Sequence, residues 1–362
     1  MIKFRTISHL LEIYVLPEVK KRIGNGKIKE SDLPLELNQF RLIQKKLAKG
    51  NVLNIIELNK EVNLRVKVKV KRAISAGESL TLKNIYPEEC FICPPVYDGK
   101  PMAYFLCQSL FYDYFLSFDF EPNLSNITEE ELEEIKIPYP ILEFINNKEF
   151  NKTVRPIEKM NILSDHNWPP APGYFPQVLL ELHKDPIIIN SPNFLKIVSN
   201  AYRTSYWDKR FAFWQETNFF PDRLPYLKRA LDAHFDKDYI ASIYILVPQF
   251  EGIIKNYLIK CGETLSGGFQ GNIEDLKKLI FSRKILMFPR KVFETIFEYL
   301  ATGSFWKSTD TVHDPATTIN RHGIAHGVFT GFECEEISLK YLILLDSLSF
   351  VLLHDKMLTR SI

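Results

Sequence analysis

The chain has 362 residues, of which 46% are hydrophobic and 25% are charged, and its formal net charge is +2. This length exceeds that of one typical domain, and the composition is that of a globular chain rather than a disordered one. A near-neutral charge argues against a non-specific binder of polyanions, which is usually more basic. The five cysteines are too few and too scattered for a disulfide scaffold.

The start of the chain and its hydropathy predict a cytoplasmic protein. Residues 1–9 lack the apolar core and the small-residue cleavage site of a secretory signal. No stretch contains 18 uninterrupted apolar residues, which a membrane-spanning helix would need. We therefore expect a reduced, cytoplasmic protein with no membrane partner.

Residues 1–167 are predicted to form a mixed α+β domain. Apolar residues at helical spacing predict a helix over 5–23, and 35–60 is predicted to be helical with basic faces. Strict alternation over 64–71 predicts a strand with one buried face. Its lysines either prevent edge-to-edge pairing or form a basic surface for a partner. The aromatic run over 102–120 fits strands or a buried helix, because periodicity alone does not separate the two.

One cysteine pair lies within this domain, at Cys90 and Cys93. A zinc ribbon needs a second such pair, and a redox pair is typical of a strand-to-helix turn. Pro94 and Pro95 follow directly and disfavour a helix. We expect two ordinary buried cysteines.

A proline-rich stretch is expected to separate the first domain from the rest of the chain. Four prolines and one glycine lie between Trp168 and Pro176, and such a run forms neither a helix nor a central strand. We therefore predict a linker and connecting segment over 168–219.

Residues 220–362 are predicted to form an all-α bundle, so that the whole chain is a two-domain α+β protein. Apolar residues recur at helical spacing throughout this part. The predicted helices cover 222–235 and 239–260, begin at Asn272 and at Pro289, and end with 335–354. A glycine-rich stretch, 267–271, is expected to be a loop rather than a phosphate cradle, because no Lys-Ser or Lys-Thr follows it.

The most informative stretch is 319–327, which reads INRHGIAHG and contains Asn320, Arg321, His322 and His326. Arginine is a fixed cation with a planar donor fork that suits phosphate. Histidine exchanges protons near neutral pH. These side chains together suit cleavage of a phosphodiester without a metal. A helix over 315–326, beginning at Asp314-Pro315, would place the two histidines one turn apart.

At this motif the chain resembles the HEPN superfamily (higher eukaryotes and prokaryotes nucleotide-binding) of helical bundles. Many members carry an Arg-x4-His pattern, which Arg321 and His326 match, late in the bundle. The resemblance covers roughly 220–355. The long helix that contains Glu251 looks like the family's earlier helix, in which an acidic residue is common.

The resemblance implies a metal-independent endoribonuclease that needs no cofactor and acts as a homodimer through its C-terminal bundle. Arg321 and His326 would be catalytic, Asn320 and His322 would position the RNA, and Glu251 would be a structural partner of Arg321. It also implies a setting in defence or as a toxin, with an antitoxin or activator at the N-terminal domain. The alternative is a non-catalytic HEPN-type module that binds a nucleotide, RNA or protein.

Two other interpretations of the motif remain open. His322 and His326 also match two zinc ligands one helical turn apart, with His313 and Asp314 as further candidates. A zinc protease would want Glu after the first histidine, where this chain has Gly323. In a purely structural interpretation, Arg321 pairs with an acid and His326 is a satisfied buried histidine.

Overall fold

The computed structural model describes the chain in two compact units, Met1–Thr153 with Arg360–Ile362, and Val154–Thr359. Helices make up most of the described structure. The described residues are 11–37, 39–46, 52–61, 67–70, 73–79, 90–93, 96–97, 100–101, 103–109, 113–118, 156–171, 176–286, 289–302, 305 and 319–360.

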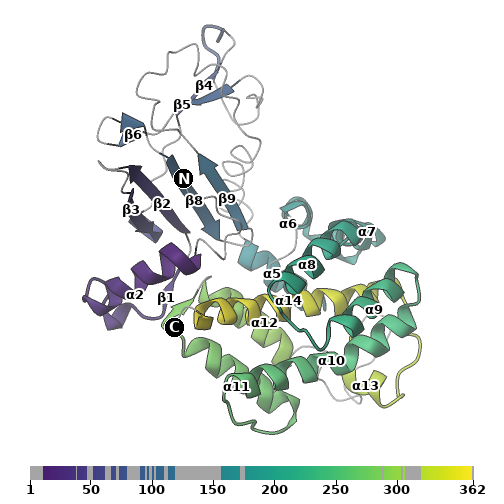
Figure 1. Ribbon diagram of the computed structural model, residues 1–362. Coiled ribbons are helices and arrows are strands. Elements are labelled where there is room, and N and C mark those ends of the chain that lie inside the picture. Colours follow the sequence, from purple (N-terminus) through teal and green to yellow (C-terminus); the bar gives the residue numbers. More distant parts are fainter. Residues whose placement is uncertain are drawn as a thin grey trace. The chain divides into compact units, whose positions relative to one another are not determined.

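In the described part of the first unit, an antiparallel sheet has the strand order β3-β2-β8-β9 (Figure 1). Its strands are β2 (Gln39–Lys46), β3 (Val52–Leu58), β8 (Ala103–Ser109) and β9 (Asp113–Phe118). The prediction of a helix over 35–60 was therefore wrong. Phe40 and Leu42 are both buried, which is the two-residue period of a strand with one face in the core. The aromatic run is two strands, one of the forms that its composition allowed.

The first unit also contains the predicted N-terminal helix, which is described from Leu11 onward. A π-helical turn (Leu11–Val15) leads into α2 (Leu16–Gly24), and Val15, Leu16 and Val19 are buried. The predicted strand over 64–71 is present as β4 (Lys67–Val70), which pairs antiparallel with β5 (Cys90–Cys93). The shorter elements are β1 (Leu35–Glu36), β6 (Val96–Tyr97), β7 (Lys100–Pro101) and 3-10 turns at Glu30–Asp32 and Asn59–Glu61.

The second unit is a helical bundle, as predicted for the C-terminal part. Its described elements are α5 (Pro156–Asp165), α6 (Pro176–Lys184), a 3-10 turn (Pro186–Asn190), α7 (Pro192–Ala201), α8 (Thr204–Glu216), α9 (Leu224–Phe235), α10 (Tyr239–Lys260), α11 (Gly268–Phe281), β10 (Ile285–Leu286), α12 (Arg290–Thr302), α13 (Arg321–Ala325) and α14 (Glu335–Arg360).

The segment 168–219, expected as a linker, instead belongs to this bundle and forms α6, α7 and α8. Trp168 is buried and packs edge-to-face against Phe194, with ring centroids 5.2 Å apart. The carbonyl of Pro170 accepts a hydrogen bond from Ser347 Oγ at 2.9 Å. Pro169 and Pro170 are buried and Pro176 begins α6, so the described part of this stretch belongs to the bundle.

Helix α10 has the predicted bounds. The Asp238 side chain caps it by accepting from the Ala241 N–H at 3.1 Å, and Gly262, with φ +80°, follows its end. Helix α11 begins earlier than expected, at Gly268, so the glycine-rich stretch opens a helix. Asn272 is fully buried inside that helix and is not its cap.

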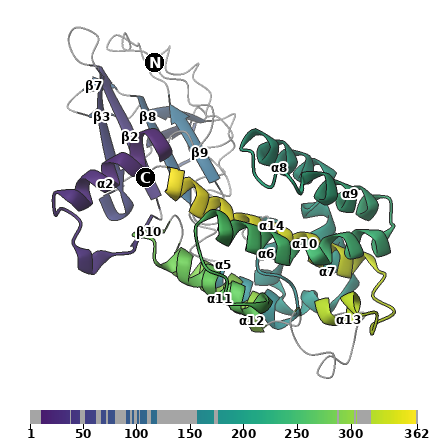
Figure 2. The ribbon, with the colours of Figure 1, turned by 60° about the horizontal axis from the view of Figure 1, so that its bottom comes forward.

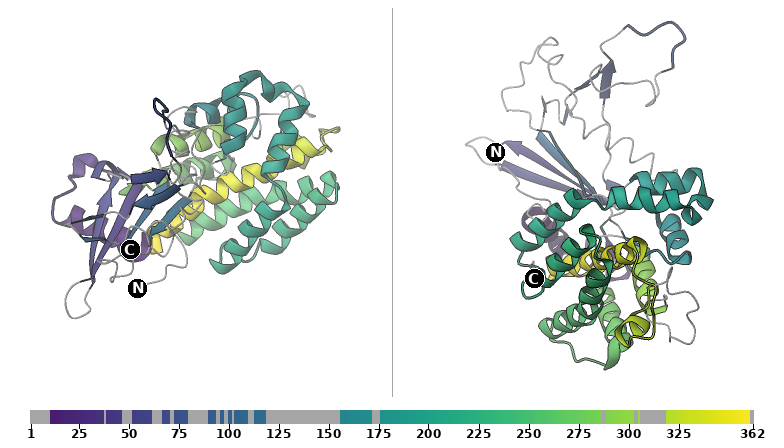
Figure 3. Two further views of the ribbon diagram at one scale, coloured as in Figure 1. Left: turned by 90° about the horizontal axis from the view of Figure 1, so that it is seen from above. Right: turned by 90° about the vertical axis from the view of Figure 1, so that its right-hand side faces the viewer.

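Helix α14 runs between the other helices of the second unit (Figures 2 and 3). The predicted helix over 335–354 is present, and every residue from Ile337 to Asp355 is buried, so the helix is enclosed on all sides. By length and composition Glu335–Lys356 could cross a membrane, yet its apolar window is wholly buried within the bundle. It is the central core helix of this unit.

Candidate functional site

The INRHGIAHG motif forms α13 and its two caps, and α13 packs against α10. Asn320 has extended backbone angles, and its Oδ1 accepts from the Gly323 N–H at 2.7 Å. Helix α13 therefore begins at Arg321, and the expected continuous helix over 315–326 was wrong at its start. An asparagine at this position satisfies an otherwise unpaired N–H of the first turn. Residues 311–318 lie outside the described part of the chain.

Asn320 is fully buried. A buried cap cannot touch a substrate on the surface, so the expected role of Asn320 in positioning RNA does not fit the structure. Its side chain instead fixes where the helix starts, and with it the direction of Arg321 and His322. The Arg321 N–H donates to the Phe305 carbonyl at 3.0 Å, which ties the start of α13 to the core.

The two histidines lie one turn apart on the same side, as the spacing predicted. Their rings are nearly parallel, with centroids 5.8 Å apart and planes at 12°. His322 is partly buried and His326 is exposed. Burial, together with the charges of Arg321 and His326, holds the pKa of His322 below its ordinary value, and Glu251 opposes this shift. His322 is therefore a neutral imidazole at neutral pH, able to accept a proton.

Arg321 forms an ion pair with Glu251 of α10, through Nη2 and Oε2. Each of these side chains is 22% exposed, so the pair lies at the surface rather than inside the bundle. The Arg321 Cζ also lies 5.9 Å from the centroid of the Phe269 ring, at the start of α11. The guanidinium is thus held between a carboxylate and an aromatic ring, and part of it faces solvent.

Glu251 carries a second cation. Lys255, one turn further along α10, places Nζ 2.7 Å from Glu251 Oε1. The hydrogen bond from Lys255 and the charge of Arg321 lower the pKa of Glu251. The carboxylate is therefore ionised at neutral pH, and the local charge of these three groups is positive. Such an arrangement suits an anion that approaches from solvent.

The structure thus brings together four of the five residues that the sequence singled out: Glu251, Arg321, His322 and His326. The sequence did not indicate Lys255 or Phe269 as part of the site. Lys255 had a usable signal, because a lysine four residues after a glutamate on a helix is a common ion pair. No sequence pattern indicated Phe269, because it lies in the glycine-rich stretch that was expected to be a loop.

Among the described residues, no group of three or more His, Cys, Asp or Glu side chains is arranged to hold a metal ion. The structure therefore adds no support for the metal interpretation. The further ligand candidates, His313 and Asp314, lie outside the described residues.

Comparison of the chain with protein-family models, with curated protein sequences and with solved structures finds no match.

Proposed function

We propose that this protein is a metal-independent endoribonuclease of HEPN type. The observation that carries the proposal is the arrangement on α13, where a guanidinium, a partly buried imidazole and an exposed imidazole lie on one short surface segment. None of the three is sealed in the core, and the buried cap Asn320 fixes the segment that holds them. The substrate is RNA, and the cellular setting is defence or a toxin system.

RNA supplies its own nucleophile, the 2′-hydroxyl beside each phosphate. A base removes the 2′-hydroxyl proton while the 2′-oxygen attacks phosphorus, and the bond from phosphorus to the 5′-oxygen breaks. An acid gives a proton to the departing 5′-oxygen. The products are a 2′,3′-cyclic phosphate and a 5′-hydroxyl. Arg321 stabilises the negative charge that grows on the phosphoryl oxygens in the transition state.

The two imidazoles have different environments, and this difference divides the proton transfers between them. The lowered pKa of His322 keeps it neutral, which suits the base. His326 is exposed at the end of α13, where it can give a proton to the leaving group. One chain then holds both an acid and a base. A homodimer through the C-terminal unit, which would bring two motifs to one RNA, is a separate part of the proposal.

A non-catalytic module that binds a nucleotide, RNA or protein is the second candidate. The ion pair between Arg321 and Glu251 favours it, because a guanidinium already paired with a carboxylate must exchange that partner before it can reach a phosphate. A module that binds a nucleotide or RNA also predicts an anion at Arg321, and only the endoribonuclease predicts bond cleavage.

The deciding experiment incubates the purified full chain with labelled RNA in EDTA. We expect cleavage that leaves cyclic-phosphate ends, and no cleavage at a position carrying a single 2′-deoxynucleotide. Arg321→Ala and His326→Ala should each lower the rate by about 100-fold or more. Matched controls are Arg229→Ala on α9 and His183→Ala on α6, two exposed positions outside the site, which should cleave at the parental rate.

Three outcomes would count against this proposal in different ways. Unchanged cleavage by both site variants would reject the assignment of the residues. No cleavage of several RNAs, tested with and without candidate activators, would favour the binding module. Cleavage that EDTA abolishes would favour the metal interpretation. Equal mixtures of the Arg321→Ala and His326→Ala chains test the dimer, because regained activity requires a site shared by two copies.

A further inference from the structure

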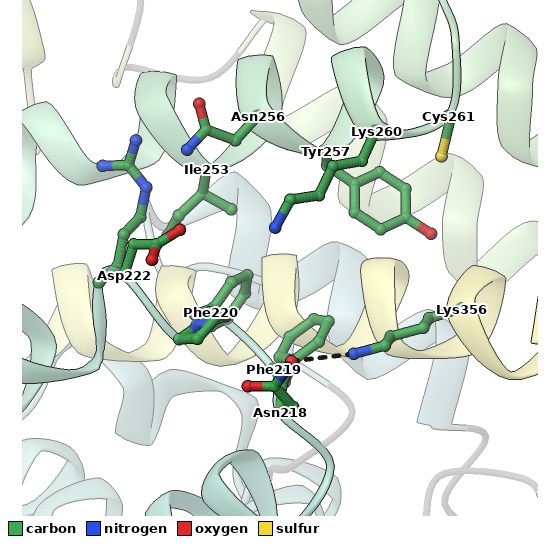
Figure 4. A pocket seen from close by; sticks show the side chains of 12 residues that line it. Asn218, Phe219, Phe220, Asp222, Ile253, Asn256, Tyr257, Lys260, Cys261 and Lys356 are labelled. Carbon is green, nitrogen blue, oxygen red and sulfur yellow. Dashed lines mark hydrogen bonds between the residues drawn. The ribbon is translucent and has the colours of Figure 1, made fainter.

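A pocket of about 210 Å³ lies in the helical unit, between the loop that follows α8 and the C-terminal half of α10 (Figure 4). Lys260 extends from α10 toward Phe220 and Asp222 of the loop (Figure 4). Tyr257 also lines the pocket, and its hydroxyl donates to Asp355 of α14 at 2.8 Å. Lys356 of α14 contributes to the same wall. The pocket volume is below the roughly 300–1,000 Å³ of most drug-sized sites, so a ligand of that size would lie partly outside the pocket.

The charges around this pocket are mostly positive. Arg223, Lys260 and Lys356 line it, against one carboxylate, Asp222. In the described part of the chain, Lys260 has no ion pair or hydrogen bond. Lys356 Nζ donates to the Thr217 and Asn218 carbonyls, both at 3.1 Å. No described carboxylate neutralises the charge of Lys260, and a bound anion would do so.

Arg223 is a second cation at the pocket that no described carboxylate neutralises. Its Nη1 donates to Gln249 Oε1 at 2.9 Å, and a neutral amide does not balance its charge. Its Nε is buried and has no hydrogen-bond partner. The guanidinium lies against Gly252, where a Cβ would come within 2.3 Å of Nη2. The glycine gives the arginine its space, and the buried donor without a partner is costly unless a ligand or water accepts from it.

The loop also presents an aromatic ring in a fixed position. Phe220 has φ +55°, a left-handed conformation that is rare for a bulky side chain. Ring contacts and main-chain hydrogen bonds hold it there. Its ring meets Trp214 edge-on at 5.7 Å, and its carbonyl accepts from the Arg223 N–H at 2.9 Å. Phe220 is partly exposed, so it offers a stacking surface at the pocket.

We propose that this pocket binds a phosphorylated ring compound of the nucleoside-monophosphate class. Lys260 and Arg223 hold the phosphate, since both carry charge that no described carboxylate neutralises. A planar base stacks on Phe220, and the exposed Asn256 amide hydrogen-bonds to the edge of that base. The proposal does not depend on RNA cleavage, because the pocket shares no residue with the α13 motif.

The test is isothermal titration of the full chain with four probes: inorganic phosphate, a nucleoside, each nucleoside monophosphate, and a short RNA oligonucleotide. We expect at least one monophosphate to bind more tightly than phosphate or the nucleoside. Lys260→Gln should lower the affinity for that monophosphate by about 10-fold or more, because a charged hydrogen bond is lost. Phe220→Leu should weaken the binding of the monophosphate but not the binding of inorganic phosphate. Lys278→Gln, an exposed lysine on α11, is the control.

Arg223 packs on Gly252, so a change there can affect folding. Asn256→Ala is therefore used as the further pocket variant, in place of a substitution at Arg223. It should reduce the difference in affinity among the four monophosphates. Arg321→Ala should leave binding unchanged. The proposal is overturned if no monophosphate binds at millimolar concentration, if Lys260→Gln binds as the parent does, or if Arg321→Ala abolishes binding. Binding of RNA alone, lost in Lys260→Gln, would also overturn it and would make this face an RNA contact.

Discussion

The ring of Phe329 lies against the Cα of Gly323, so closely that a Cβ at position 323 would come within 2.5 Å of ring atoms Cγ and Cδ2. The Val328 and Phe329 N–H groups both donate to the Gly323 carbonyl, at 2.8 and 3.0 Å. The chain therefore folds back over α13 directly after His326. A glycine between the two histidines is required by this packing.

Gly323→Ala should destabilise the helical unit by about 1–3 kcal/mol, the usual cost of forcing extra volume into a packed site. Urea unfolding followed by circular dichroism would measure the change. Phe329→Leu in the same chain should recover part of the loss, because it removes the atoms that clash. Gly24→Ala, where no atom lies within 4 Å of a new Cβ, should stay within about 0.5 kcal/mol. An unaltered midpoint for Gly323→Ala would contradict the close contact.

The pKa of His322 should respond to Glu251. Burial, Arg321 and His326 lower it, and the Glu251 carboxylate opposes them. We expect NMR titration to give His322 a pKa below that of an unfolded peptide, and lower still in Glu251→Gln. Lys255→Gln keeps the carboxylate and should not lower this pKa. A His322 titration that is the same in Glu251→Gln as in the parent would show that the carboxylate does not act on the ring.

Acid should destabilise the helical unit through two buried histidines. Burial lowers the pKa of His234 from 6.5 to about 4, and the charge of Glu335 opposes this shift. Burial also lowers the pKa of His354 to about 3. The hydrogen bond to the Phe350 carbonyl opposes that shift, and the charge of Arg210 adds to it. The unfolded chain binds more protons below pH 6.5, so stability rises with pH in this range. The stability present above pH 6.5 is lost as pH falls toward 4. Each group contributes up to about 1.4 kcal/mol per pH unit.

Urea unfolding at pH 4.5, 5.25, 6 and 7 tests this sign. His354→Gln cannot titrate, so its stability should fall less steeply with acid, by about 1 kcal/mol per pH unit between pH 4.5 and 6. His183→Gln, an exposed position on α6, should keep the parental slope. If the slope of His354→Gln equals that of the parent, His354 is not buried in its neutral form.

Asp346 should be one of the most sensitive positions in the chain. It is fully buried on α14, where Arg210 Nη2 lies 2.9 Å from Oδ1 and Tyr206 Oη donates to Oδ2 at 2.7 Å. Asp346→Ala leaves the Arg210 guanidinium without its counter-charge and should cost about 3–5 kcal/mol. Glu181→Gln, which breaks the surface pair with Lys184, should cost about 1 kcal/mol or less. Similar losses for the two variants would show that the pair of Asp346 and Arg210 behaves as a surface ion pair and not as a buried one.

Local signals predicted α9, α10, α12 and α14 of the second unit, but not α6, α7 and α8, which lie in the stretch expected as a linker. The apolar spacing of α10 and the cap acceptor at Asp238 are local features of the helix itself. Its bounds could therefore be predicted from the sequence without knowledge of the fold. The hairpin β2–β3 was misread as a helix, because Phe40 and Leu42 show their two-residue period only over a short stretch. Strand pairing depends on partners far along the chain, which a local pattern does not contain.

The candidate site was predictable in its residues but not in their roles. Asn320 and Asp314 are both good cap residues, and the sequence favoured Asp314; the structure has Asn320 as the cap. That choice decides whether Asn320 faces a substrate or the core. Likewise, the proline run at 168–176 has the composition of a linker, and only the packing of Trp168 on Phe194 shows that it belongs to the bundle.

The enclosure of α14 has a practical consequence for truncation. A fragment starting at residue 220 would contain the whole stretch that resembles the nuclease family, yet it would lack Arg210, the buried counter-ion of Asp346. It would also lack Pro170, whose carbonyl accepts from Ser347. Such a fragment would uncover one side of its central apolar helix and aggregate. Expression trials aimed at the helical unit alone should therefore begin near Val154.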